Sequence, residues 1–166
     1  MANTFSALAS VRVGSGGAAS ISFTSIPQTY TDLLVKISGR TSNAYFRDSV
    51  EVRPNDAITD LSGLFLIGQG TTVASGPQSA AYVEIEGDTA TSSIFGDAEL
   101  YIPNYTSSLT KTIAGQAATE NNNSASNALW YNVSYWNNSS AITSLTLISA
   151  TWLEYSIATL YGIKNS

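Results

Sequence analysis

The sequence predicts an all-β fold: an antiparallel β-sandwich, jelly-roll-like, with about ten short strands. Two observations favour it. Apolar and polar residues alternate over many short segments, which is typical of strands that bury one face. Clusters of Gly, Pro or Asn separate these segments, as expected where turns connect antiparallel strands.

The composition agrees with this fold class. Ser, Thr and Asn account for 55 of the 166 residues, and charged residues for only 11%. Thr favours strands, Ser and Asn favour turns, and exposed helices usually carry more charge than this chain has. Hydrophobic residues make up 43% of the chain, which is enough for one buried core at this length. We expect residues 1–166 to form a single β-sandwich domain.

The first half of the chain predicts six strands. Alternation runs from Phe5 to Val13, and it resumes from Ala19 to Phe23 after a glycine-rich stretch at residues 14–17. We expect these two strands to form a hairpin around the glycine-rich turn. The stretch is not a phosphate-binding loop, because it lacks the Lys-Ser/Thr ending and precedes a strand. The other four strands are expected at residues 32–39, 49–53, 61–67 and 81–86.

The second half of the chain continues the pattern. Strands are expected at residues 98–102, 110–119, 129–136, 142–148 and 155–163, and Pro103 ends the first of these. No segment has the period of a helix. The Asn-rich residues 121–124 indicate an exposed, mobile loop.

The strand at residues 129–136 holds the candidate contact residues. Trp130, Asn132, Ser134 and Trp136 share one face, and we expect the opposite face, beginning with Leu129, to be the core side. The first face would then be polar, with a tryptophan near each end to stack on a sugar or meet another subunit. We favour the other interpretation, in which both faces are partly buried and the tryptophans fill the interior of the sandwich. The candidate residues for contact with a glycan or a subunit are Trp130, Asn132, Trp136 and Tyr105.

Catalytic chemistry is restricted by the residues that are missing. The chain has no His and no Cys, which excludes a Ser-His-Asp triad and zinc sites built from those ligands. Two carboxylate pairs, Glu84 with Glu86 and Asp97 with Glu99, have the i, i+2 spacing that places them on one strand face. Paired carboxylates serve glycoside hydrolysis, but we interpret these as solvated side chains on the outer face of a sheet.

The same reasoning predicts neither a cofactor nor a bound metal. Asp56, Asp60 and Asp88 offer oxygen ligands without the spacing of a calcium-binding loop. The net charge is −5, and the seven basic residues do not cluster, so we expect no nucleic-acid binding. No apolar run approaches the roughly 20 residues of a membrane-spanning helix, so we expect no membrane insertion.

Several segments of the chain form a recognisable series: residues 20–27 (SISFTSIP), 30–33 (YTDL), 101–105 (YIPNY) with 111–112 (KT), 141–147 (AITSLTL) and 160–163 (LYGI). In this order they resemble segments of a group of short proteins from tailed bacteriophages, which are usually taken to be virion structural components. The resemblance spans nearly the whole chain. It implies a head-decoration, fibre or tail-associated protein with a β-sandwich fold.

We therefore expect a non-enzymatic structural protein that decorates or cements the capsid or tail of a bacteriophage. The expected partners are other copies of the chain, as a homotrimer, and capsid or tail proteins. The expected location is the virion, assembled in the cytoplasm of the bacterial host. The alternative is a fibre or adhesin domain that binds a glycan of the host surface.

Overall fold

The computed structural model describes residues 4–123 and 125–164. Within these ranges the chain forms twelve strands and no helix, so the prediction of an all-β fold is confirmed. The strands are β1 Phe5–Arg12, β2 Ala18–Phe23, β3 Asp32–Gly39, β4 Arg47–Pro54, β5 Leu61–Gln69, β6 Thr72–Gln78, β7 Tyr82–Glu86, β8 Gly96–Ile102, β9 Lys111–Thr119, β10 Ala128–Trp136, β11 Leu145–Trp152 and β12 Ile157–Ile163.

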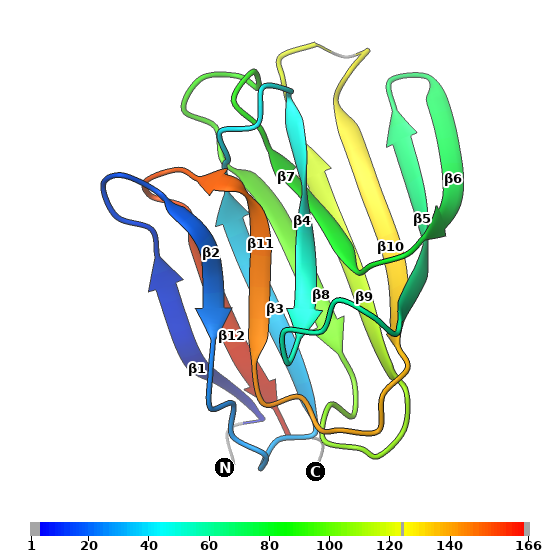
Figure 1. Ribbon diagram of the computed structural model, residues 1–166. Helices are drawn as coiled ribbons and strands as arrows, with labels where there is room; N and C mark the ends of the chain where they lie inside the picture. Colours follow the sequence, from blue (N-terminus) through cyan, green and yellow to red (C-terminus); the bar gives the residue numbers. More distant parts are fainter. Residues whose placement is uncertain (1–3, 124, 165–166) are drawn as a thin grey trace.

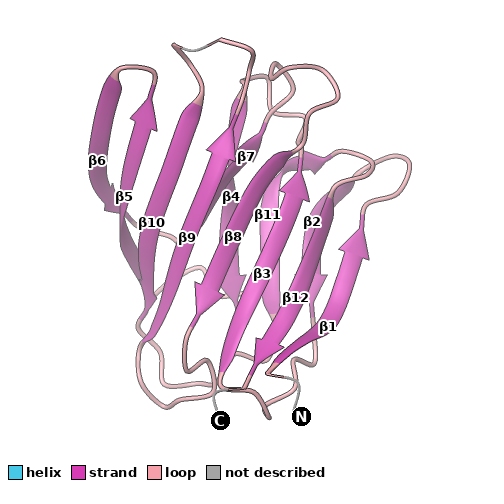
Figure 2. Ribbon diagram, turned by 180° about the vertical axis from the view of Figure 1, so that it is seen from behind, coloured by secondary structure: helices cyan, strands magenta, loops and turns pink. Residues whose placement is uncertain are grey.

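The strands form two packed antiparallel sheets of unequal size (Figure 1). Sheet A has eight strands in the order β1-β12-β3-β8-β9-β10-β5-β6, and sheet B has four in the order β2-β11-β4-β7. The strands from β1 to β4 alternate between the two sheets, and so do β7, β8, β11 and β12. This alternation is jelly-roll-like. Sheet A continues beyond β8 with β9, β10, β5 and β6 (Figure 2).

The core lies between the sheets, as the alternation predicts. On β3, Leu33, Val35 and Ile37 are buried and point toward sheet B, where Val50 and Val52 of β4 belong to the same hydrophobic cluster. Burial of this apolar surface is the main stabilising contribution. No helix in the described part of the chain is long and apolar enough to cross a membrane.

The predicted hairpin of the first two strands is wrong. Strand β1 pairs with β12 in sheet A, and β2 pairs with β11 in sheet B. The glycine-rich turn therefore carries the chain from one sheet to the other. Gly16 and Gly17 have φ values of +92° and +76°, and a Cβ on Gly17 would lie 2.6 Å from the Trp152 carbonyl oxygen. Both the backbone conformation and the close approach require glycine.

Strand β6 was not predicted. It pairs with β5 as a hairpin and forms one edge of sheet A. Gly76 and Pro77 lie within it, and both residues are depleted in strands. Proline has no backbone N–H and cannot donate a hydrogen bond to a neighbouring strand. An edge strand tolerates it because no strand lies on its outer side.

The Asn-rich loop connects β9 with β10, as predicted from its composition. Asn122 and Asn123 are exposed, and Ser124 lies outside the described residues.

Candidate functional site

The outer face of sheet A, turned away from sheet B, is apolar along β10, β5 and β6. The positions that point outward from these strands alternate with buried ones, and many carry exposed leucine or tyrosine side chains. Leu66 is 48% exposed and Tyr131 is 53% exposed. We call the following residues the outer apolar face: Leu64, Leu66, Val73, Leu129, Tyr131, Val133 and Tyr135.

Strand register makes the outer apolar face continuous. Tyr131 lies opposite Leu66 and Val133 opposite Leu64, which places their side chains next to one another on one side of the sheet. Near one end of the face, Leu129 and Val73 lie on either side of Gly68, which has no side chain. The outward positions of the described strands β9, β10, β5 and β6 carry no charged side chain.

The outer face of sheet A has a different character on β3 and β8. There Lys36 forms an ion pair with Glu99, and Asp97 is exposed. On β3 and β8 the outer face thus carries charged side chains, whereas on β10, β5 and β6 it carries exposed apolar ones. Contiguous apolar surface of this kind marks protein interaction sites.

A cleft of about 590 Å³ lies on the other side of sheet A, where the sheet extends beyond the edge of sheet B. Strand β7 is that edge, and the cleft is lined by β4 and β7 on one side and by β5, β6 and β10 on the other. We call this cavity the lateral cleft. Its polar and aromatic lining residues include Tyr45, Arg47, Ser49, Phe65, Glu84 and Trp130.

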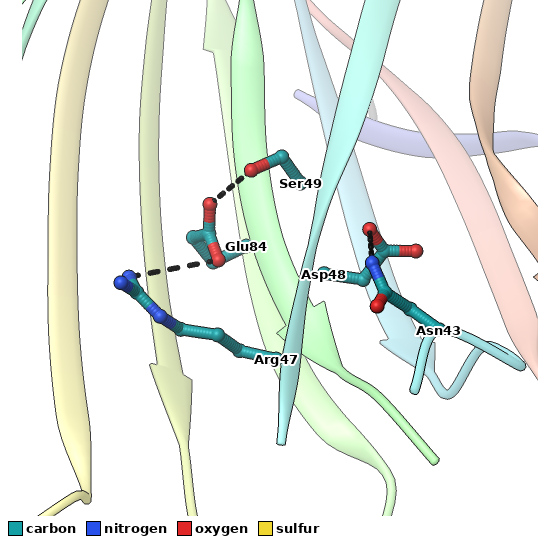
Figure 3. Close-up of polar contacts among 5 residues, drawn as sticks. All are labelled: Asn43, Arg47, Asp48, Ser49 and Glu84. Carbon is teal, nitrogen blue, oxygen red and sulfur yellow. Dashed lines mark hydrogen bonds and ion pairs between the residues drawn. The ribbon is translucent and has the colours of Figure 1, made fainter. Parts of the chain in front are cut away.

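The polar wall of the lateral cleft comes from β4 and β7. Ser49 and Glu84 are register partners, and Ser49 Oγ donates a hydrogen bond of 2.5 Å to Glu84 Oε1 (Figure 3). Arg47 Nη1 lies 3.8 Å from Glu84 Oε2. Burial raises the pKa of Glu84 above its ordinary value, whereas the Ser49 hydrogen bond and the Arg47 charge oppose that rise. The polar wall thus places the Arg47 guanidinium, which can only donate hydrogen bonds, beside the Glu84 carboxylate, which accepts them.

The aromatic wall comes from β5 and β10. Phe65 and Trp130 stack with ring centroids 4.8 Å apart and planes 6° apart. The Arg47 guanidinium carbon lies 5.8 Å from the centre of the Trp130 ring, within the range of a cation–π interaction. Arg47 therefore connects the charged wall with the aromatic one.

The predicted core side of β10 is wrong. Trp130, Asn132 and Trp136 do share one face with Ser134, but this face is buried against the interior, and it is the face of Leu129 and Tyr131 that is exposed. The interpretation that the tryptophans fill the sandwich is the one the structure supports. The reason is that β7 of sheet B packs against β10 and that Phe65 of the neighbouring strand β5 stacks on Trp130.

Tyr105 is also fully buried. Its hydroxyl donates a hydrogen bond to the Pro27 carbonyl oxygen. Of the four candidate contact residues, only Trp130 lines the lateral cleft, and the structure does not bring Tyr105 to it.

The expectation that Glu84 and Glu86 are solvated is wrong. They are 4% and 1% exposed, because β7 packs against β8, β9 and β10 as well as against β4. Glu84 lines the lateral cleft, whereas Glu86 Oε1 accepts a hydrogen bond of 2.6 Å from the Glu120 backbone N–H. Asp97 and Glu99 do lie on the outer face, as expected.

Other buried charges have structural partners. Arg40 donates hydrogen bonds to four backbone carbonyls between residues 88 and 94 and so holds the β7-β8 loop. Asp48 accepts a hydrogen bond of 2.8 Å from Thr41 Oγ1 and one of 2.7 Å from Asn43 Nδ2 (Figure 3). In the described part of the chain, no three acidic side chains gather where they could hold a metal ion.

Sequence reasoning missed most of the lateral cleft. Arg47, Phe65 and Tyr45 come from strands or loops that are distant in sequence, and none has a local signal that marks it as part of a site. The cleft arises from the unequal sizes of the two sheets, which depend on long-range pairing.

Fold and surfaces together define a jelly-roll-like β-sandwich with the outer apolar face on β5, β6 and β10 and with a lateral cleft. No protein-family model, curated protein or solved structure matches the chain.

Proposed function

We propose that this chain is a non-enzymatic structural protein of a bacteriophage particle and that it attaches through the outer apolar face. The observation that carries this proposal is the continuous, uncharged surface formed by residues such as Leu66 and Tyr131. The sequence resemblance to tailed-phage virion proteins supports the setting. The partners we propose are further copies of the chain, as a homotrimer, and a capsid or tail protein.

The chemistry of the surface suits attachment. Leu64, Leu66 and Leu129 are each about half exposed or more, so burial against a partner would gain about 25 cal/mol for every Å² of apolar surface removed from water. Tyrosine is enriched at protein interfaces because it combines a large apolar ring with a hydroxyl. The absence of charge on these strands avoids the desolvation cost of burying an ion.

The arrangement of carboxylates supports a function without catalysis. The lateral cleft has one carboxylate, Glu84, among its described lining residues. Glycoside hydrolysis by the common mechanisms needs two carboxyl groups that flank the same bond. Glu86, the other member of the predicted pair, is engaged by the backbone of Glu120 instead.

Sedimentation velocity tests the attachment surface. We expect the parent protein to form a trimer and Leu66→Glu to sediment as a monomer, because the substitution places a charge at the centre of the outer apolar face. Ser20→Glu is the matched control, since Ser20 is an exposed strand residue of sheet B. A monomeric parent protein, or a Leu66→Glu variant that still associates, would contradict the proposal for self-association.

Mass spectrometry of purified virions tests the setting. We expect the chain in particles of the phage that encodes it, at a copy number comparable with other structural proteins. Particles that lack the chain would rule out a virion role.

A further inference from the structure

We infer that the lateral cleft is a binding site for a neutral oligosaccharide. The inference goes beyond the structural function proposed above, because the cleft lies on the opposite side of sheet A from the outer apolar face. Trp130 and Tyr131 are adjacent on β10 and point to opposite sides of the sheet. The chain could therefore use both surfaces at once.

The aromatic wall fits the apolar side of a sugar ring. The C–H groups on one side of a pyranose carry partial positive charge, and the faces of aromatic rings are negative, so the two surfaces attract each other. Phe65 is only partly buried, and stacking on Trp130 fixes its plane. A ring held in place by stacking offers a flat platform at little cost in conformational entropy.

The polar wall fits the hydroxyl groups. Each sugar hydroxyl is both a donor and an acceptor, and Arg47 donates while the Glu84 carboxylate accepts. Ser49 and Arg47 orient that carboxylate. Glu84 is 4% exposed, and a carboxylate this deeply buried beside a cavity is suited to recognition of a ligand group.

The charge balance of the cleft favours a neutral ligand. Arg47 and Glu84 are the charged side chains among the described lining residues, and they carry opposite charges. An anionic sugar would meet Glu84, and a cationic one would meet Arg47. A neutral saccharide meets both groups without an unpaired charge.

The size of the cleft agrees with a ligand. Its volume of about 590 Å³ lies within the range of small-molecule sites, roughly 300–1,000 Å³. Trp130 borders this volume, so its indole resonance reports on what occupies the cleft.

Indole resonances offer a direct test on the full chain. The three tryptophans give three Nε1–H signals, and that of Trp130 is assigned with Trp130→Phe. The neutral probes are cellobiose, maltotriose, lactose and N,N′-diacetylchitobiose, compared with anionic sialyllactose and with trialanine. We expect at least one neutral sugar to shift the Trp130 signal saturably. Trp152, whose Nε1 donates to the Leu147 carbonyl, should not respond.

Substitutions locate the binding. We expect Phe65→Ala, and Arg47→Met, which keeps the aliphatic stem, to weaken binding at least tenfold. Phe65→Leu keeps an apolar side chain without the flat ring and should also weaken it, which covers the case that Phe65→Ala does not fold. Tyr131→Ala removes an aromatic ring from the other side of the same strand and should leave the affinity unchanged.

Three results would overturn the inference: no saturable shift with any neutral sugar at tens of millimolar, unchanged affinity in Phe65→Leu and Arg47→Met, or binding of only sialyllactose or trialanine. Failure here leaves the structural function standing, because that function is tested by Leu66→Glu and by virion composition.

Discussion

Glu86 shows how one buried carboxylate couples stability to pH. Its side chain is 1% exposed, and one of its oxygens is buried without a hydrogen-bond partner. Burial raises its pKa from 4.5 to about 7; the charge of Glu120 adds to the rise, whereas the Glu120 backbone hydrogen bond and the charge of Arg40 oppose it. The folded protein therefore holds this proton more tightly than the unfolded chain does. The resulting stabilisation is complete below about pH 4.5 and is lost as the pH rises through about 7.

Glu86→Gln should remove this pH dependence. The amide oxygen can still accept the Glu120 N–H, and the variant cannot ionise. We expect the variant to be more stable than the parent at pH 8 by roughly 2–3 kcal/mol, since one pKa unit corresponds to about 1.36 kcal/mol. The measurement is urea unfolding between pH 5 and pH 8 at fixed protein concentration.

Glu99→Gln is the control for that experiment. Glu99 pairs with Lys36 on the outer face, and exposed ion pairs contribute only about 0–1 kcal/mol. This variant should keep the parent's decline in stability above pH 5. The explanation given for Glu86 is wrong if Glu86→Gln declines just as steeply as the parent.

At the scale of elements, the pairing of β9 with β10 depends on a glycine. Gly115 lies opposite Asn132, and a Cβ on Gly115 would collide with Asn132 Oδ1 and lie 3.3 Å from Leu100 Cδ2. Asn132 is buried, and its amide lies 3.4 Å from Ser134 Oγ. Glycine at this position thus makes room for a buried polar side chain.

Gly115→Ala should accordingly destabilise the protein by about 1–3 kcal/mol, the usual cost of overpacking a well-packed interior. Combining it with Asn132→Ala, which removes the colliding amide, should recover part of the loss. Denaturant unfolding of both single variants and of the double variant gives the coupling energy. Additive effects of the two substitutions would show that the amide is not the cause.

The two faces of β10 also show what local sequence can predict. Alternation correctly divided the strand into two sets of residues, but aromatic side chains occur in both, so the pattern did not indicate which set is inside. That choice depends on which side of β10 the β7 strand of sheet B packs against. The same limit explains Glu84 and Glu86, where polar residues alternate with Val83 and Ile85 on a strand that is covered on both faces.

For the whole molecule, the fold class was predictable and the arrangement of sheets was not. Period-2 alternation and turn residues are local signals, and they identified most strands. A turn such as Gly14 to Gly17 has the same composition whether it closes a hairpin or crosses between sheets, so the position of β1 and β2 was predicted wrongly. The lateral cleft depends on the order of strands in sheet A, which no local segment encodes.

Association through the outer apolar face should make thermal stability depend on concentration. Binding that requires the folded state stabilises it by mass action, and for a trimer each tenfold rise in concentration contributes about 1 kcal/mol. In a domain of this size that corresponds to roughly 2–4 °C in Tm. Calorimetry from about 1 to 100 µM should show this rise for the parent and for Ser20→Glu, but a constant Tm for Leu66→Glu. A parent Tm that does not change with concentration would mean that the outer apolar face is not buried between copies of the chain under these conditions.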